Sequence, residues 1–232
     1  MTIAESIARI REKIETAARQ SGRQGQDILL LGASKMNDAA RCREAIAAGI
    51  DALGENRVQE MQEKLAQQAY TGVPLHFIGH LQRNKVKNVV GQVSLIQSVG
   101  SLELLEEIEK QAARQDLCQN ILLEVNIGEE AAKSGFAPSS VFQAADHALT
   151  LPHVCVKGLM AIPPIAVKPH GNTLYFDKMY RLFIDINEKI YDNTWEYISM
   201  GMSEDYEDAI RCGANLVRIG SGIFGARNYQ RS

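Results

Sequence analysis

Apolar residues are arranged along this chain in two alternating patterns. Short runs without a polar break, such as Ile28–Leu31, are typical of strands that are buried on both faces. Longer segments carry apolar residues at three- and four-residue steps, which is the spacing of an amphipathic helix. The first of these segments contains Ile3, Ile7 and Ile10, and we expect this helix to end at Gly22.

Strand-like runs and helical segments alternate through the whole sequence. The predicted strands are Ile28–Leu31, Asp51–Leu53, Leu75–Ile78, Leu95–Ile96, Ile121–Val125, Val154–Met160, Tyr197–Met200 and Leu216–Ile219. Such alternation, at a spacing of roughly 25–30 residues, predicts βαβ units and a parallel sheet. Eight units in 232 residues fit a closed (β/α)8 barrel, whose usual size is about 250 residues. We therefore predict an α/β fold, a single-domain (β/α)8 TIM barrel.

An open, doubly wound sheet is the alternative fold. Its nucleotide-binding form carries GxGxxG after the first strand, whereas this chain has GASKMND there, so the barrel is favoured. The sequence contains no Pro/Gly/Ser-rich linker and no shift in composition. We therefore expect one domain over residues 1–232, with residues 1–22 forming an N-terminal helix packed on the barrel.

Composition and charge exclude several classes of function. The chain is 45% hydrophobic and 23% charged, with a net charge of −3, which favours a globular protein without a nucleic-acid partner. No apolar run approaches the ~20 residues of a membrane span, and the N-terminus has no signal-peptide core. The four cysteines are scattered without metal-ligand spacing, so we expect reduced thiols, a cytoplasmic protein and no metal site.

Candidate chemistry gathers where the predicted strands end. The carboxyl ends of barrel strands form the ligand-binding mouth. Lys35 follows the first strand there, while SMGMS and RIGSG follow the last two. Glycine and serine at such turns suit a phosphate, and a partly desolvated lysine can attack a carbonyl carbon. Together these features point to pyridoxal 5′-phosphate (PLP), with Arg218 facing its pyridine nitrogen.

Each of these residues also has a simpler structural explanation. Lys35 alone suits a solvated turn, and Gly-Ser pairs at strand ends are commonly turns. Arg218 can pair with a carboxylate such as Glu196, and Glu55 is either a general base or an acid that stabilises a helix N-terminus.

Seven motifs together resemble the YggS/PROSC-type pyridoxal phosphate homeostasis protein family. They are LGASK, GENRVQE, HFIGHLQRNKVK, EVNIGEEAAKSGF, GLMAIPP, SMGMSEDYEDAI and VRIGSGIFGARNY, and the similarity spans about Ile28 to Tyr229. The resemblance implies a barrel like the N-terminal domain of bacterial alanine racemase.

The resemblance also implies a role for individual residues. The Schiff-base lysine of the family corresponds to Lys35, the pyridine-nitrogen arginine to Arg218, and the ring-side asparagine to Asn56. The phosphate-binding residues correspond to Ser199, Ser203, Gly220 and Ser221. The chain departs from the family at Met36-Asn37, where a polar-basic pair is usual, and this affects the loop contacts beside the lysine.

Two functions remain open at this stage. The first is PLP homeostasis, in which PLP is held as a reversible Schiff base without turnover, so that the protein is not an enzyme and has no catalytic residue. The alternative is a PLP-dependent amino-acid racemase, which needs two bases. Related racemases take the second base, a tyrosine, from a further β domain, and with the sequence ending at Ser232 we expect that domain to be absent. We favour the first function, for a monomer that makes transient contacts with PLP-dependent enzymes.

Overall fold

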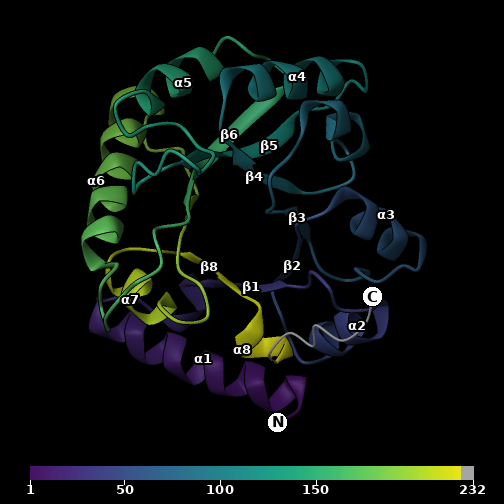
Figure 1. Ribbon diagram of the computed structural model, residues 1–232, viewed down its shortest axis with the longest axis vertical. Helices are drawn as coiled ribbons and strands as arrows, with labels where there is room; N and C mark the ends of the chain where they lie inside the picture. Colours follow the sequence, from purple (N-terminus) through teal and green to yellow (C-terminus); the bar gives the residue numbers. More distant parts are fainter. Residues whose placement is uncertain (226–232) are drawn as a thin grey trace.

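Eight parallel strands hydrogen-bond in sequence order and close into a barrel in the computed structural model, which describes residues 1–225. The strands form an inner ring and the helices surround it (Figure 1). The strands are β1 (Leu29–Ala33), β2 (Ala52–Glu55), β3 (Leu75–Phe77), β4 (Leu95–Val99), β5 (Gln119–Val125), β6 (Val154–Ala161), β7 (Tyr197–Ser199) and β8 (Leu216–Ile219). The predicted (β/α)8 barrel is confirmed, and the open-sheet alternative is wrong because β1 pairs with β8.

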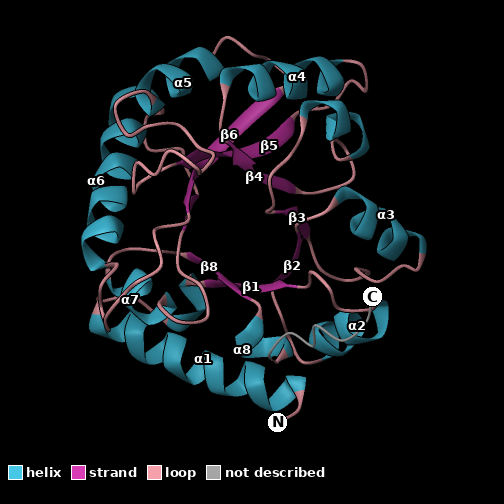
Figure 2. Ribbon diagram, in the orientation of Figure 1, coloured by secondary structure: helices cyan, strands magenta, loops and turns pink. Residues whose placement is uncertain are grey.

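Helices cover the outside of the barrel (Figure 2). They are α1 (Ile3–Gln20), α2 (Ala39–Ala47), α3 (Val58–Ala66), α4 (Leu102–Ala113), α5 (Val141–Ala148), α6 (Thr173–Ile190), α7 (Tyr206–Arg211) and α8 (Ser221–Phe224), with 3₁₀ turns η1 (Gly25–Asp27) and η2 (Arg83–Asn88). The helix α1 begins with a capping box between Thr2 and Glu5, and Gly22 follows its end with φ 74°. It packs against α2, α7 and α8.

The second strand extends further than predicted. The expected strand was Asp51–Leu53, whereas β2 continues through Gly54 and Glu55, and α3 begins at Val58. The family resemblance extends to Tyr229, and residues 226–229 of that motif lie outside the described part of the chain. Within residues 1–225, no helix combines the length and the apolar character that crossing a bilayer requires.

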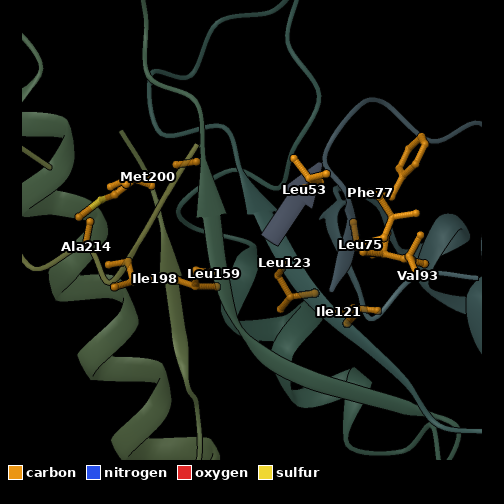
Figure 3. Packing of buried hydrophobic residues seen from close by; sticks show 14 of the residues in the cluster. Leu53, Leu75, Phe77, Val93, Ile121, Leu123, Leu159, Ile198, Met200 and Ala214 are labelled. Carbon is orange, nitrogen blue, oxygen red and sulfur yellow. The ribbon is translucent and has the colours of Figure 1, made fainter. Parts of the chain in front are cut away.

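Hydrophobic side chains are buried in two layers, because successive residues of a strand point to opposite faces. The outer layer lies between the strands and the helices and includes Leu53, Phe77, Ile121 and Leu159 (Figure 3). The smaller inner layer fills the barrel with Leu31, Ala33, Ala52, Ile78, Leu95, Leu122, Met160 and Leu216. This alternation also assigns each polar residue of a strand to the barrel interior or to the helix layer.

A chain of polar side chains crosses the barrel interior among the residues of the inner apolar layer. Gln97 Nε2 lies 2.9 Å from His76 Nδ1, and Ser199 Oγ donates to Gln97 Oε1 at 2.7 Å. Arg218 donates from Nη1 to Ser199 Oγ and from Nη2 to the carbonyl oxygen of Ala161, the latter at 2.9 Å. Because the Gln97 oxygen accepts from Ser199, its amide nitrogen faces His76, which must accept and is therefore neutral.

The four cysteines are less scattered in space than in sequence. The side chains of Cys118 and Cys155 lie in contact at the start of β5 and β6. The parallel register of these strands, which pairs Asn120 with Cys155, brings the two thiols together.

We predict that the buried imidazole makes the protein less stable in acid. Burial lowers the pKa of His76 to about 4, against about 6.5 in an unfolded chain. Between these values the unfolded state binds the additional proton, so the free energy of unfolding falls as the pH falls from 6.5 to 4, by about 3 kcal/mol. Urea unfolding at several pH values measures this loss.

His76→Gln isolates the contribution of the imidazole, since glutamine keeps an amide for Gln97. This variant should lose less stability than the wild type between pH 6.5 and pH 4. His80→Gln, which changes an exposed histidine just beyond β3, is the matched control. Identical acid profiles for the wild type and His76→Gln would contradict the assignment.

Candidate functional site

A cavity of about 280 Å³ opens at the carboxyl ends of the strands. The turns after β1, β2, β7 and β8 supply most of its wall. Of the residues predicted from the sequence, six lie on this wall: Lys35, Asn56, Ser203, Arg218, Gly220 and Ser221. Residues from both ends of the described chain thus line one site, since β8 closes the barrel against β1.

The lysine reaches the cavity because of its position in the strand alternation. Leu31 and Ala33 point into the barrel, and Lys35 continues the same face beyond the end of β1. Its side chain is half-buried on the cavity wall. The following residue, Met36, has a left-handed backbone conformation with φ 62°, which is uncommon for a residue other than glycine. This turn separates β1 from the helix α2, whose N-cap is Asp38.

The asparagine after β2 presents an unsatisfied polar atom. Asn56 Oδ1 is buried and has no hydrogen-bond partner among the described residues. The backbone around it is tightly packed, since a Cβ on Gly79 would lie 2.3 Å from the carbonyl oxygen of Asn56. Only glycine fits there, and the neighbouring turn therefore fixes Asn56 in place. A buried acceptor without a donor on a cavity wall is suited to a ligand that carries a hydroxyl group.

The turns after β7 and β8 join through their serines. Ser221 Oγ donates to Ser203 Oγ at 3.1 Å, and the backbone N–H of Gly222 donates to the same oxygen at 3.2 Å. Ser203 accepts in both contacts, so its own hydroxyl hydrogen can donate to an anion. Gly201, with φ 92°, allows the sharp turn that leads from β7 to Ser203, because an added Cβ would lie 2.6 Å from Ala209.

Arg218 forms the floor of the cavity at its polar end. It is buried against Ser199 and the Ala161 carbonyl group, and it does not pair with Glu196, which binds Lys157 at 2.5 Å. Burial lowers the pKa of Arg218 to about 10, while Glu124 and Asp205 act in the opposite direction. The guanidinium therefore remains a charged donor at neutral pH.

One predicted residue does not lie on the cavity wall. The Ser199 side chain is fully buried, donates to Gln97 and accepts from Arg218. The structure therefore places its hydroxyl below the cavity, where it orients the guanidinium. Ser199 and Ser203 have equal weight in the sequence because both lie in SMGMS. The structure separates them, because Ser199 is the last residue of β7 and points into the barrel, whereas Ser203 lies in the turn beyond Gly201.

Glu55 takes neither of the roles that its sequence position suggested. It is the last residue of β2, points outward beneath α3 and has no solvent exposure. Its Oε1 atom accepts from Ser34 Oγ at 2.6 Å, Lys64 Nζ at 2.7 Å and Tyr70 OH at 3.0 Å. It is therefore part of a buried ionic cluster behind the cavity wall.

The sequence analysis did not identify this cluster. The one feature of the sequence that indicates it is the position of Lys64, three residues after Met61 and six after Val58, on the buried face of α3. A lysine in that stripe calls for a buried carboxylate, and Glu55 is too far along the chain for helix spacing to identify it.

Comparison with known proteins finds relatives over the full length of this chain. A family model described as "Alanine racemase, N-terminal domain" matches residues 6–228. A protein of Aquifex aeolicus named pyridoxal phosphate homeostasis protein is 40% identical over 229 residues, covering 99% of this chain and 100% of the relative. A protein of the same name from Pasteurella multocida is 36% identical and covers 100% of both chains.

Solved structures show the same barrel. PipY of Synechococcus elongatus, in a structure with PLP bound, superposes with a TM-score of 0.84 at 28% identity and covers 97% of this chain and 100% of its own. An alanine racemase of Clostridium difficile has a TM-score of 0.70 at 16% identity, covering 96% of this chain and 57% of the racemase, which shows a shared fold. The chain therefore belongs to the alanine racemase N-terminal domain family and, within it, to the pyridoxal phosphate homeostasis proteins.

Proposed function

We propose that this protein binds PLP and holds it as a reversible Schiff base on Lys35, without catalytic turnover. One observation carries the proposal: a lysine side chain and a hydroxyl-rich turn lie on the same cavity wall, together with an unsatisfied carbonyl oxygen. PLP carries an aldehyde, a phosphate and a ring hydroxyl, so each group has a complementary residue. PipY, whose structure holds PLP, has the same fold at 28% identity.

The two ends of the cavity suit different groups of PLP. Ser203, Gly220 and Ser221 lie at the end formed by β7 and β8, where hydroxyl and backbone donors suit a phosphate. Lys35 and Asn56 lie at the end formed by β1 and β2. A phosphate held at the first end brings the aldehyde toward the lysine, and this proximity favours the covalent bond.

The position of Arg218 suits storage of PLP better than catalysis with it. When bound, PLP supplies an aldehyde for imine formation and a ring that can accept electrons. A guanidinium has five donors and no acceptor, so Arg218 can only donate to the ring nitrogen. The nitrogen then stays unprotonated, and the ring accepts electrons less readily. Ser199 and Ala161 hold the guanidinium in this orientation.

Amino-acid racemisation is the second candidate, because the fold is that of alanine racemase. A racemase needs a base on each face of the α-carbon. The ionisable side chains on the described cavity wall are Lys35, Glu204 and Arg218. Arginine does not act as a base, and Glu204 is exposed at the rim. A wall with one well-placed base suits reversible storage of the cofactor, and the names of the relatives agree with this choice.

The first prediction from the proposed function concerns the covalent bond. Mixing the protein with PLP should produce a visible imine band, and borohydride reduction followed by peptide mapping should place the adduct on Lys35. Lys35→Ala should lose this band, because no other lysine lines the described cavity. Lys178→Ala, which removes an exposed lysine on α6, is the control. An adduct at another lysine in the wild type would refute the assignment.

The second prediction concerns the phosphate. Ser203→Ala and Ser221→Ala should each weaken PLP binding about tenfold or more, because a hydrogen bond to a charged group contributes about 1.5–3 kcal/mol. Binding of pyridoxal, which lacks the phosphate, should not change. Calorimetric titration of both ligands measures the difference, with Ser140→Ala, at a partly exposed residue before α5 and outside the cavity wall, as the control. Equal losses for the two ligands would place the phosphate elsewhere.

The third prediction separates storage from catalysis. The PLP-loaded protein should interconvert D- and L-amino acids with a turnover well below about 1 per second, the lower end of typical enzymes. A chiral assay over a panel of amino acids, with an alanine racemase as the positive control, measures this rate. Enzyme-like turnover of any amino acid in the panel would favour the racemase.

A further inference from the structure

A buried lysine lies directly behind the turn that carries Lys35. The Lys64 side chain is 6% exposed, and its Nζ atom makes three short contacts. It donates to the carbonyl oxygen of Ser34 at 2.9 Å, to Glu55 Oε1 at 2.7 Å and to Glu60 Oε1 at 2.7 Å. One ammonium group therefore connects the end of β1, the end of β2 and the first turns of α3.

The cluster holds the backbone on both sides of Lys35. Ser34, the residue before it, is bound through its carbonyl oxygen by Lys64 and through its hydroxyl by Glu55. Met36, the residue after it, donates its backbone N–H to Glu60 Oε1. The same Glu60 oxygen binds Lys64, so the two anchors are joined. Met36 has a left-handed backbone conformation, and this contact helps to maintain it.

The charges in the cluster depend on one another. Burial alone would lower the pKa of Lys64, but Glu55 and Glu60 outweigh this effect and raise it, so the ammonium stays charged. Burial raises the pKa of Glu55, and the Lys64 ammonium opposes that shift. Glu55 Oε2 is buried without a hydrogen-bond partner among the described residues. Lys64 is therefore the counter-charge on which the buried Glu55 carboxylate relies.

Packing alone does not account for this arrangement. A buried ion pair is often no more stabilising than apolar side chains of similar volume, because both charges lose their hydration. An apolar residue at position 64 would continue the buried stripe of Val58 and Met61 on α3. It would not bind the Ser34 carbonyl group or orient Glu60 toward Met36. The ionic cluster therefore contributes a fixed position of the turn after β1, which contains Ser34 and Met36.

We propose that Lys64 is a positioning residue for Lys35: with Glu55 and Glu60 it fixes the turn after β1 so that the Lys35 amine faces the PLP aldehyde. This role rests on the proposed function, since it acts through Schiff-base formation. The anion-binding serines lie on the turns after β7 and β8, and neither contacts the cluster. Loss of Lys64 should therefore slow the covalent step and leave phosphate binding intact.

The experiment compares two ligands that differ at the reacting carbon. PLP reports phosphate binding and imine formation together, whereas pyridoxine 5′-phosphate carries an alcohol in place of the aldehyde and reports binding alone. Lys64→Met removes the ammonium and keeps an unbranched side chain. We expect imine formation with PLP, followed by stopped-flow absorbance, to slow about ten- to hundredfold, because small misplacements of a reacting group cost this much. The affinity for pyridoxine 5′-phosphate should stay within about twofold.

A second variant keeps the test informative if Lys64→Met does not fold. Glu60→Ala removes the anchor of Met36 from a partly exposed position and leaves the Lys64–Glu55 pair in place. It should slow imine formation in the same direction with unchanged affinity for pyridoxine 5′-phosphate. Glu63→Ala, an exposed neighbour on α3, and Lys189→Met, an exposed lysine paired with Asp185, are the matched controls and should behave as the wild type.

The outcomes separate the two proposals. If the wild type forms its adduct on Lys35 but Glu60→Ala and folded Lys64→Met react at the wild-type rate, the positioning role is wrong and the proposed function stands. Equal losses of affinity for PLP and for pyridoxine 5′-phosphate would also overturn the positioning role, because they indicate a general structural effect of the substitution. A wild type that forms no Schiff base on Lys35 overturns the proposed function and the positioning role with it. Slower imine formation with PLP, together with an unchanged affinity for pyridoxine 5′-phosphate, supports both the positioning role and the proposed function.

Discussion

The pairing of β1 with β8 is the constraint on which the rest of the site depends. In this register Leu31 lies opposite Arg218, and both side chains point into the barrel. Lys35 and Gly220 then emerge from neighbouring strands at the same mouth. If the sheet stayed open, the lysine and the residues after β8 would lie on separate edges, and no single cavity would contain both. Closure also removes exposed sheet edges, so every strand has two neighbours.

The alternation of side chains then produces two separate polar systems. Inward positions carry His76, Gln97, Ser199 and Arg218, which form a hydrogen-bonded chain beneath the cavity. Outward positions carry the cluster around Glu55, which lies between the strands and α3. The first system orients the Arg218 guanidinium at the floor of the cavity, and the second holds the backbone around the lysine. Apolar layers separate them, so each is protected from water, which strengthens its electrostatic contacts.

Both systems place polar groups where desolvation is costly. The neutral imidazole of His76 and the Glu55 carboxylate, whose counter-charge is Lys64, both lose hydration on folding, which lowers the stability of the fold. In this barrel the imidazole lies below the cavity wall, among inner-layer residues such as Leu95, and the carboxylate lies behind that wall. This distribution is typical of a scaffold that gives up some stability to hold a binding site.

The order of strands and helices follows from the sequence alone, since each strand is a short apolar run and each long helix has a regular apolar stripe. The residues at the strand ends, among them Lys35, Asn56 and the serine turns, follow from it as well. The neighbours that support them depend on how the elements pack in the barrel. Ser199 differs from Ser203 through its inward position on β7, and Lys64 finds Glu55 through the packing of α3 on β2. Local periodicity records which face of an element is buried, but a contact between two elements depends on barrel closure and register, which no single segment encodes.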